Sequence, residues 1–339
     1  MLQVNDLDVN YESSEGIVQA VDGVTIELNE GENLGIVGES GCGKSTLAKA
    51  ILGVLPSNGY INSGSIEFRG TNLASLSTRE QREYKWEEIS MIPQSAMNAL
   101  DPVYTIREQI IEAVDIHRPD EPNPDSIVDE MFNLVGLDPN RADQYPHQFS
   151  GGMRQRAMIA MSLALDPALI LADEPTTALD VIMQDQILNR ISSIQDDIDS
   201  SMLIITHDVA VVAETCDRVA VMYAGEIVEE GTVDQIFGKA YHPYTLGLQN
   251  AFPNVNKPDQ DLISIPGYPP NLADPPTGCR FADRCPMATE ECEQESPSLN
   301  QVDAVNADHR SACHHSDRID TDLRPKAQQA ETWSEEVTQ

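Results

Sequence analysis

The fold of this chain is decided by the stretch Gly38-Glu39-Ser40-Gly41-Cys42-Gly43-Lys44-Ser45-Thr46. It matches the phosphate-loop pattern G-x-x-x-x-G-K-[ST], with an apolar strand pattern before it at 33–37 and a helical pattern after it at 44–52. The glycines let backbone N–H groups turn inward around a β-phosphate, and the N-terminus of the helix adds positive potential. Lys44 is placed to reach the β- and γ-phosphates and Ser45 to ligate Mg²⁺, while Cys42 stands at a variable position. The stretch therefore predicts a nucleoside triphosphate site.

Two further motifs follow far downstream. The first is Phe149-Ser150-Gly151-Gly152-Met153, in which Ser150 is a suitable helix N-cap and the free amides behind it form an anion site. The second is the apolar run 169–172, which ends on Asp173 and Glu174. Because a buried strand precedes this pair, we expect both carboxylates at the carboxyl edge of a sheet beside the phosphates. Asp173 would then belong to the Mg²⁺ shell and Glu174 would polarise the attacking water.

Taken in this order, the motifs resemble those of ATP-binding cassette (ABC) proteins, whose signature loop is matched by Ser150, Gly151 and Gly152. The resemblance implies that this loop faces the γ-phosphate of ATP bound to an opposite subunit, so that each site needs two cassettes. It also implies a role for four single residues: Gln94 in a Q-loop that senses Mg²⁺ and the γ-phosphate, His207 in a switch that contacts the γ-phosphate, Asp180 in a D-loop that crosses to the partner, and Tyr11 in stacking on adenine. For Tyr11 the alternative is a surface ring that packs on its own sheet.

The hydrophobic patterns predict an α/β fold. We expect an ABC-type P-loop nucleotide-binding domain, with a mainly parallel sheet, an antiparallel β subdomain and a helical insertion, followed by a small Cys-rich C-terminal appendage. Strand patterns occur at 2–9, 21–29, 33–37, 64–69, 89–93, 168–172, 202–206, 218–222 and 227–229. We divide the chain into an ABC ATPase domain at 1–235 (helical subdomain about 95–165), a C-terminal region with four Cys at 236–319, and a polar tail at 320–339 that we expect to be disordered.

The composition is strongly acidic. The chain has 56 acidic and 21 basic residues, so the formal net charge of −35 makes nucleic acid an unsuitable partner. At molar salt the screening length falls to roughly 3 Å and the self-repulsion of such a surface largely disappears. We interpret the charge as adaptation to a high-salt cytoplasm, as in halophilic archaea. No signal peptide is recognisable and no apolar run approaches the roughly 20 residues of a membrane span, so we expect action at a membrane surface through partner chains.

The C-terminal region contains three short motifs. They are His242-Pro243-Tyr244-Thr245, then Ile265-Pro266-Gly267 with Pro269-Pro270, and finally Gly278-Cys279-Arg280-Phe281 with Arg284-Cys285-Pro286. These motifs closely resemble the C-terminal region of dipeptide/oligopeptide importer ATPases, and Met153 also resembles that branch. The resemblance covers nearly the whole chain, to about residue 318.

Four of the six Cys fall in this region: Cys279, Cys285, Cys292 and Cys313. Four thiols near one another in a reducing compartment suggest a metal rather than disulfides. Zinc sites usually contain at least one C-x₂₋₄-C pair, which this chain lacks, and four Cys can also hold an iron–sulfur cluster. The family resemblance favours a [4Fe-4S] cluster, while zinc and free thiols remain alternatives. The neighbouring His309, His314 and His315 are expected to face solvent.

The resemblance implies an import ATPase in which two cassettes close on two ATP molecules and move two membrane permease subunits between inward and outward states. It implies short peptides as the chief cargo, with nickel or a sugar as alternatives, and an extracellular solute-binding protein that acts through the permeases. The chain would lie on the cytoplasmic face of the membrane, with segment 95–106 contacting a permease coupling helix. Its second cassette would be a related, non-identical ATPase, with a homodimer as the alternative.

Three other functions can be compared with the sequence. Soluble ABC ATPases that act on DNA or ribosomes generally carry long coiled coils or two cassettes in one chain, whereas this sequence has one cassette, no heptad run and a charge unsuited to nucleic acid. A regulatory ATP-binding subunit with poor turnover conflicts with the presence of Glu174 and His207. A motor whose Cys region also senses redox state is compatible with the sequence.

Overall fold

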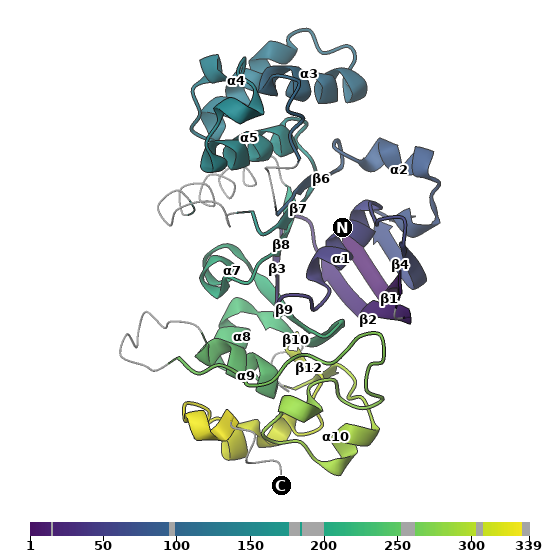
Figure 1. Cartoon of the computed structure of the whole chain (residues 1–339), viewed down its shortest axis with the longest axis vertical. Helices are drawn as coiled ribbons and strands as arrows, with labels where there is room; N and C mark the ends of the chain where they lie inside the picture. The colour runs from purple at the N-terminus through teal and green to yellow at the C-terminus, as the bar shows by residue number, and fades with distance from the viewer. Residues whose placement is uncertain are drawn as a thin grey trace. The chain divides into compact units, whose positions relative to one another are not determined.

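A computed structural model describes residues 1–14, 16–94, 99–175, 184, 200–251, 262–302 and 308–333. The chain divides into two compact units (Figure 1). The helical unit contains Met1, Leu28–Asn33 and Ser75–Ile205, and the P-loop unit contains Leu2–Glu27, Leu34–Ala74 and Thr206–Gln339. Within the described residues, no helix is both long enough and apolar enough to span a bilayer.

The P-loop unit contains an antiparallel sheet in the order β2-β1-β4-β5. Its strands are β1 (Leu2–Ser13), β2 (Gly16–Leu28), β4 (Gly59–Phe68) and β5 (Thr71–Asn72). The strands at 2–9 and 21–29 are confirmed, but β4 begins well before the predicted residue 64. Its polar first half reads poorly as a strand, yet its backbone pairs with β1 from Tyr11↔Gly59 onward. β4 is therefore longer than its side-chain pattern predicts, because its polar first half also pairs with the backbone of β1.

A second set of strands in this unit follows the order β11-β12-β10-β9-β3. The parallel pair is β3 (Asn33–Val37) and β9 (Arg218–Tyr223), and β10 (Glu226–Thr232), β12 (Arg310–Ser311) and β11 (Asn300–Gln301) continue antiparallel. The α-helices of the unit are α1 (Lys44–Leu52), α7 (Val209–Thr215), α8 (Val233–Gly238), α9 (Pro243–Asn250) and α10 (Glu290–Gln294). Because β12 pairs with β10, the Cys-rich region extends the sheet instead of forming a separate lobe.

The predicted disorder of the tail at 320–339 is wrong for residues 320–333. Short helical turns cover Ile319–Leu323 and Ala330–Trp333. Leu323, Ala327 and Trp333 are buried in the same hydrophobic cluster as Tyr223 and Tyr244. Burial of these few apolar side chains orders the tail from 320 to 333. The polar composition of the stretch gives no indication of that burial. Residues 334–339 lie outside the described part of the chain.

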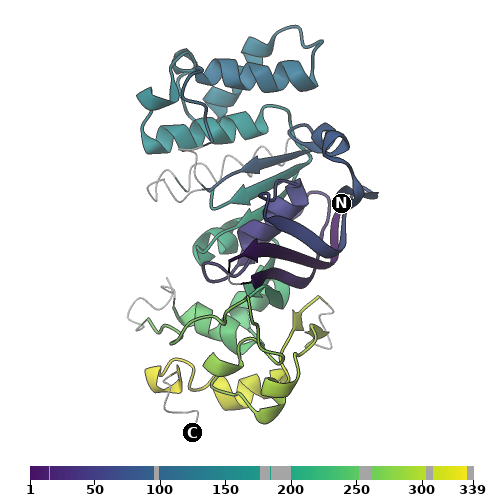
Figure 2. The same ribbon diagram turned by 45° about the vertical axis from the view of Figure 1, so that its right-hand side comes forward.

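The helical unit combines three parallel strands with a group of helices. The strands, in the order β8-β7-β6, are β6 (Ile89–Ile92), β7 (Leu169–Asp173) and β8 (Ser201–Ile205). Every residue of β7 and β8 is buried, as expected for strands of a parallel sheet. The α-helices among the described residues of this unit are α2 (Thr78–Tyr84), α3 (Ile106–His117), α4 (Pro124–Leu134) and α5 (Gly151–Leu163), and the last three pack together as the teal group in Figure 2. α3, α4 and α5 all lie within the stretch of about 95–165 for which the sequence predicts a helical subdomain.

Candidate functional site

The phosphate loop connects β3 to α1 within the P-loop unit. Gly43, directly before α1, has φ +111°, and a Cβ there would lie 2.2 Å from the carbonyl oxygen of Ala20. Only glycine combines that backbone conformation with so close an approach to β2. The predicted helix 44–52 begins and ends as expected, with Lys44 as its first residue. The loop is therefore a rigid turn at the N-terminus of a helix, which is the arrangement that binds phosphate.

The Lys44 ammonium is folded back on its own loop. It is nearly buried, and Nζ donates 2.8 Å hydrogen bonds to the carbonyl oxygens of Gly38 and Glu39. Cys42 is buried beside it, and that burial raises the pKa of the Cys42 thiol. A protonated, buried thiol is a poor nucleophile, which agrees with Cys42 as a spacer.

Tyr11 lies next to the loop at the end of β1. Its hydroxyl is 3.1 Å from the hydroxyl of Thr46, the third residue of α1, so the two share a hydrogen bond. Its ring contacts the backbone of Gly59 on β4, where a Cβ would meet ring carbon Cε1 at 2.6 Å. The ring is therefore held at the edge of the loop by groups on two other elements, and it packs on its own sheet as well.

The acidic pair lies at the carboxyl end of β7, in the helical unit. Asp173 is buried at 3% exposure. Glu174 has φ +48°, a left-handed conformation that is uncommon for a residue with a Cβ, and its N–H donates to the carbonyl of Ile205 at 2.7 Å. Such conformations persist only where the surrounding structure enforces them, and they concentrate at functional sites.

Gln94 and Glu174 meet directly. β6 and β7 run parallel with Ile92 opposite Ala172, so the two residues follow their strands at the same edge of the sheet. Gln94 Nε2 donates a 2.8 Å hydrogen bond to Glu174 Oε2. The sequence predicts that Gln94 and Glu174 each lie at the end of a strand. The register of β6 and β7 brings the two side chains into contact.

Ser150 caps the signature helix α5 as predicted. Its hydroxyl accepts a 3.3 Å hydrogen bond from the backbone N–H of Met153. Gln155, on the buried face of α5, donates a 2.7 Å hydrogen bond to the carbonyl of Pro175. Pro175 directly follows Glu174, so a side chain that the sequence analysis did not single out ties the signature helix to the acidic pair.

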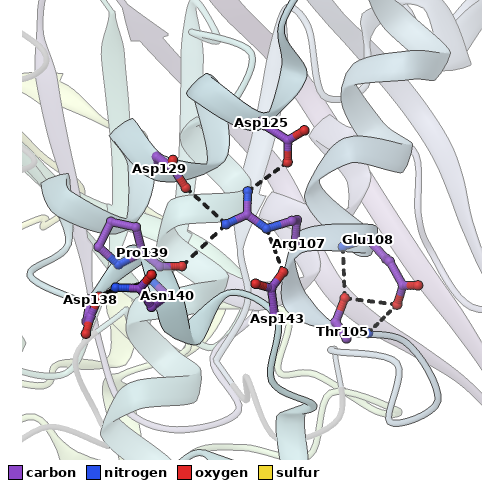
Figure 3. Close-up of polar contacts among 9 residues, drawn as sticks. All are labelled: Thr105, Arg107, Glu108, Asp125, Asp129, Asp138, Pro139, Asn140 and Asp143. Atoms are coloured by element: carbon purple, nitrogen blue, oxygen red, sulfur yellow. Dashed lines mark hydrogen bonds and ion pairs between the residues drawn. The ribbon is translucent and has the colours of Figure 1, made fainter.

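A second residue missed from the sequence is Arg107 on α3 (Figure 3). Its guanidinium contacts Asp125 at 2.8 Å, Asp129 at 3.0 Å and Asp143 at 2.8 Å. Asp125 and Asp129 lie on α4, while Asp143 lies in the segment that leads to the signature loop. One cation therefore joins α3, α4 and that segment. An ion pair between elements far apart in sequence leaves no local pattern.

The remaining predicted site residues are described in part. Thr206 directly follows β8, which ends at Ile205, one residue earlier than predicted. His207 lies between β8 and α7, where Asp208 caps α7 by accepting from the N–H of Ala210 at 3.0 Å. Asp180 and residues 95–98 of the proposed permease contact lie outside the described residues.

The four C-terminal Cys line one cavity in the P-loop unit, together with His315 and other side chains. A Cβ at Gly278 would lie 2.3 Å from the carbonyl of Cys292, and this close approach lets Cys279 N–H donate to the same carbonyl at 2.7 Å. Burial raises the pKa of Cys279 to about 11 and that of Cys313 to about 12, and it also raises the pKa of Cys285. The four thiols thus share a cavity, as their spacing suggested. In the described part of the chain, no three His, Cys, Asp or Glu side chains are grouped closely enough to hold a single metal ion.

The prediction that His309 faces solvent is wrong. The ring is 2% exposed and its Nε2 lies 2.9 Å from the buried carboxylate of Glu229. The backbone N–H groups of Tyr241 and His242 donate to the same carboxylate. Glu229 thus connects β10 to the start of α9 and to His309, and a buried carboxylate needs these partners.

The chain matches known families over both of its parts. Residues 21–177 match the ABC transporter family model, and residues 228–292 match the model of the oligopeptide/dipeptide transporter C-terminal region. A relative from Sinorhizobium fredii, described as a "Probable peptide ABC transporter ATP-binding protein", is 46% identical over 94% of this chain and 96% of its own length. The oligopeptide transport ATP-binding protein of Haemophilus influenzae is 44% identical over 88% of this chain and 93% of its own length.

The fold also matches solved cassettes. The ATP-binding cassette MJ0796, as a dimer in a post-hydrolysis state with ADP and Pi bound, superposes with a TM-score of 0.64 at 26% identity. That match covers 69% of this chain and 99% of the other. The expected ABC ATPase fold is therefore confirmed. The chain belongs to the ATP-binding subunits of the oligopeptide/dipeptide ABC transporter family, which are ATPases.

Proposed function

We propose that this chain hydrolyses ATP to power the import of short peptides through two membrane permease subunits. The observation that carries the proposal is the contact between Gln94 and Glu174 at the edge of a buried parallel sheet, in a chain that also contains a complete phosphate loop. A carboxylate held in a strained conformation and bonded by a side-chain amide is suited to orient a water molecule.

The proposed roles follow from the positions of the side chains. The loop amides at 38–46 and Lys44 bind the phosphates, and Tyr11 stacks on adenine with its hydroxyl anchored by Thr46. Ser45, Gln94 and the buried Asp173 would hold Mg²⁺, which neutralises phosphate charge when it is bound. Glu174 accepts the proton of the attacking water, and His207 contacts the γ-phosphate.

The site is proposed to be completed by a second cassette. Ser150, Gly151 and Gly152 offer the N-terminus of α5, whose free amides suit the γ-phosphate of ATP bound to the partner. Asp180 would reach across in the D-loop. The dimeric form of the solved cassette supports this arrangement. We propose a related, non-identical ATPase as the partner, with a homodimer as the alternative.

The permease contact is proposed at 95–106, on the cytoplasmic face of the membrane. Val103 is 69% exposed and Tyr104 is 52% exposed, so two large apolar side chains face outward directly before α3. An extracellular solute-binding protein would deliver the cargo to the permeases. Nickel or a sugar remains an alternative cargo, because cargo choice belongs to those partners.

We propose that Cys279, Cys285, Cys292 and Cys313 hold a [4Fe-4S] cluster. The support is the donor set: four thiols line one cavity of the P-loop unit, and four Cys are the usual ligands of such a cluster. Burial raises the pKa of Cys285 and Cys313, and the backbone N–H that donates to each sulfur at 3.4 Å opposes that rise.

The acidic surface supports a further proposal, that the protein works at multimolar salt in a halophilic archaeon. The net charge of −35 is spread over the chain, and screening at such salt removes most of its self-repulsion. Basic residues are few relative to acidic ones, and at Arg107 a single guanidinium pairs with three carboxylates.

The function is tested by reconstitution with its two permeases and measurement of ATP-dependent peptide uptake in multimolar KCl. Uptake that requires ATP and stops in the Glu174→Gln variant supports the proposal. ATP hydrolysis without uptake of any peptide, nickel or sugar would favour the soluble, non-transport class. Iron, sulfide and zinc measured per chain after anaerobic purification test the Cys site: about four irons support the cluster, whereas zinc or no metal contradicts it.

A further inference from the structure

Arg284, from the Cys-rich region, is bound at every donor of its guanidinium. Nε donates to the carbonyl of Pro266 at 2.9 Å, Nη1 to the hydroxyl of Tyr223 at 3.2 Å, and Nη2 to the carbonyl of Ile265 at 3.3 Å. Nη1 and Nη2 also donate to the two carboxylate oxygens of Glu39, at 2.9 and 3.0 Å. A guanidinium has five N–H donors in a planar fork, so this set uses all of them. The side chain is only 6% exposed.

Glu39 is the second residue of the phosphate loop, and three of its groups are bound. Its carboxylate receives the fork of Arg284, and its backbone N–H donates to the hydroxyl of Tyr244 at 2.9 Å. Its carbonyl accepts from Lys44 Nζ at 2.8 Å. Tyr244 is fully buried and packs on Tyr223 with ring centroids 4.6 Å apart. The loop is thus fixed at Glu39 from the C-terminal region.

The charge of Glu39 makes this contact functional as well as structural. A carboxylate in a loop that binds polyphosphate repels the ligand unless a cation balances it. Arg284 supplies that balance in a bidentate geometry, which a Lys could not reproduce. The guanidinium also lies over the rings of Tyr223 and Phe281, at 5.7 and 6.0 Å from their centroids, so its position is determined by packing too.

We infer that Arg284 is a positioning residue for ATP binding, which acts by holding and neutralising Glu39 of the phosphate loop. Two motifs of the C-terminal region contact this loop residue, His242–Thr245 through Tyr244 and Arg284–Pro286 through the guanidinium. A third motif, Ile265–Gly267, holds the guanidinium of Arg284 through its carbonyls. The C-terminal region therefore has a task in nucleotide binding, apart from the Cys site. The inference rests on the proposed ATP site.

The test is a double-mutant cycle in the full chain. KM for ATP, kcat and the affinity for an ATP analogue are measured for Arg284→Gln, Glu39→Gln and the double variant. We expect Arg284→Gln to raise KM at least fivefold with kcat changed less than twofold, because an unbalanced carboxylate then faces the phosphates. In the Glu39→Gln background the same substitution should change KM less than twofold.

The outcomes separate the explanations. Arg284→Lys retains the positive charge but cannot form the bidentate contact with Glu39, so it should give a KM between those of the wild type and Arg284→Gln. If Arg284→Gln does not fold, Arg284→Lys takes its place in the cycle. Arg318→Gln is the matched control: it removes an exposed (i, i+4) pair with Asp322 in the same region and should leave KM unchanged. An unchanged KM in Arg284→Gln, or an equal rise in both backgrounds, would overturn the inference. Failure of the wild-type chain to bind ATP would instead overturn the proposed function.

Discussion

The side-chain amide of Gln94 donates a 2.8 Å hydrogen bond to the carboxylate of Glu174. The two residues follow neighbouring parallel strands, so their contact depends on the register of β6 and β7 rather than on a flexible loop. A carboxylate held in this way is already oriented before a nucleotide arrives, as the general base proposed for this site would need to be.

Removal of this amide is the first prediction. Gln94→Ala should lower kcat by about tenfold to a hundredfold, because Glu174 loses the donor that orients it. It should also raise KM for MgATP, because Gln94 is a proposed Mg²⁺ ligand. Steady-state ATPase kinetics measure both constants. Gln155→Ala is a useful comparison, since it removes the hydrogen bond from α5 to the carbonyl of Pro175. That variant should lower the free energy of unfolding in addition to kcat. A Gln94→Ala enzyme with wild-type kcat would refute the proposed role.

The second prediction concerns Lys44. Lys44→Ala should weaken ATP binding by about tenfold or more, because the cation proposed to bind the β- and γ-phosphates is lost. Its Nζ donates hydrogen bonds to the carbonyls of Gly38 and Glu39, and these two acceptors compete with phosphate oxygens for the ammonium. Lys49→Ala, in the last turn of the same helix, is the matched control and should bind ATP normally. Equal affinities in both variants would contradict the assignment.

The third prediction concerns the salt dependence of stability. Arg107→Gln should lower the free energy of unfolding by about 1–3 kcal/mol, because it leaves three carboxylates around a vacated centre. The loss should be larger in 0.1 M KCl than in 1 M KCl, since salt screens the remaining repulsion. Arg118→Gln removes one ion pair, with Asp166, and a hydrogen bond to the carbonyl of Leu165, and it should cost less because only one carboxylate is left unpaired. Denaturant unfolding at the two salt concentrations would decide, and a salt-independent loss would show that packing rather than charge dominates.

The fourth prediction is a pH dependence at Glu226. Burial raises the pKa of this carboxyl to about 7, Arg280 at 3.2 Å opposes the shift and Asp22 adds to it. A raised pKa favours the protonated form in the folded state, so the contribution to stability is complete at pH values below the ordinary pKa and is lost as the pH rises through 7. Glu226→Gln should therefore match the wild type at pH 4 and exceed it by about 1–2 kcal/mol at pH 8. Thermal melts across that range measure the difference, with the exposed Glu12→Gln as the flat control. A gap that closes with rising pH would contradict the stated sign.

Local motifs made the centre of the site predictable. The loop at 38–46 is specified by glycines whose backbone angles few other residues adopt, and Ser150 is specified by the capping preference of a helix N-terminus. The strand ends at Gln94 and Asp173 follow from short apolar runs. Each of these features depends on fewer than about ten consecutive residues, which is the range over which the sequence pattern is informative.

The features that were missed depend on long-range contacts. Arg284 and Glu39 are 245 residues apart, and no periodicity links them. The tail at 320–333 reads as polar, but Leu323 and Trp333 find a buried cluster made by distant elements. His309 reads as a surface residue until β12 pairs with β10 and brings it to Glu229. The positions of these side chains are determined by tertiary contacts between distant segments, and those contacts cannot be predicted from the pattern of a single sequence.

The most direct test of the account compares ATP binding and hydrolysis by the wild-type chain and Glu174→Gln in multimolar KCl. The account predicts that the variant binds MgATP with wild-type affinity, loses at least about a hundredfold in kcat, as expected for removal of a general base, and accumulates as a closed, ATP-bound dimer. A variant that hydrolyses ATP at the wild-type rate would contradict the assignment of Glu174 and, with it, the proposed mechanism.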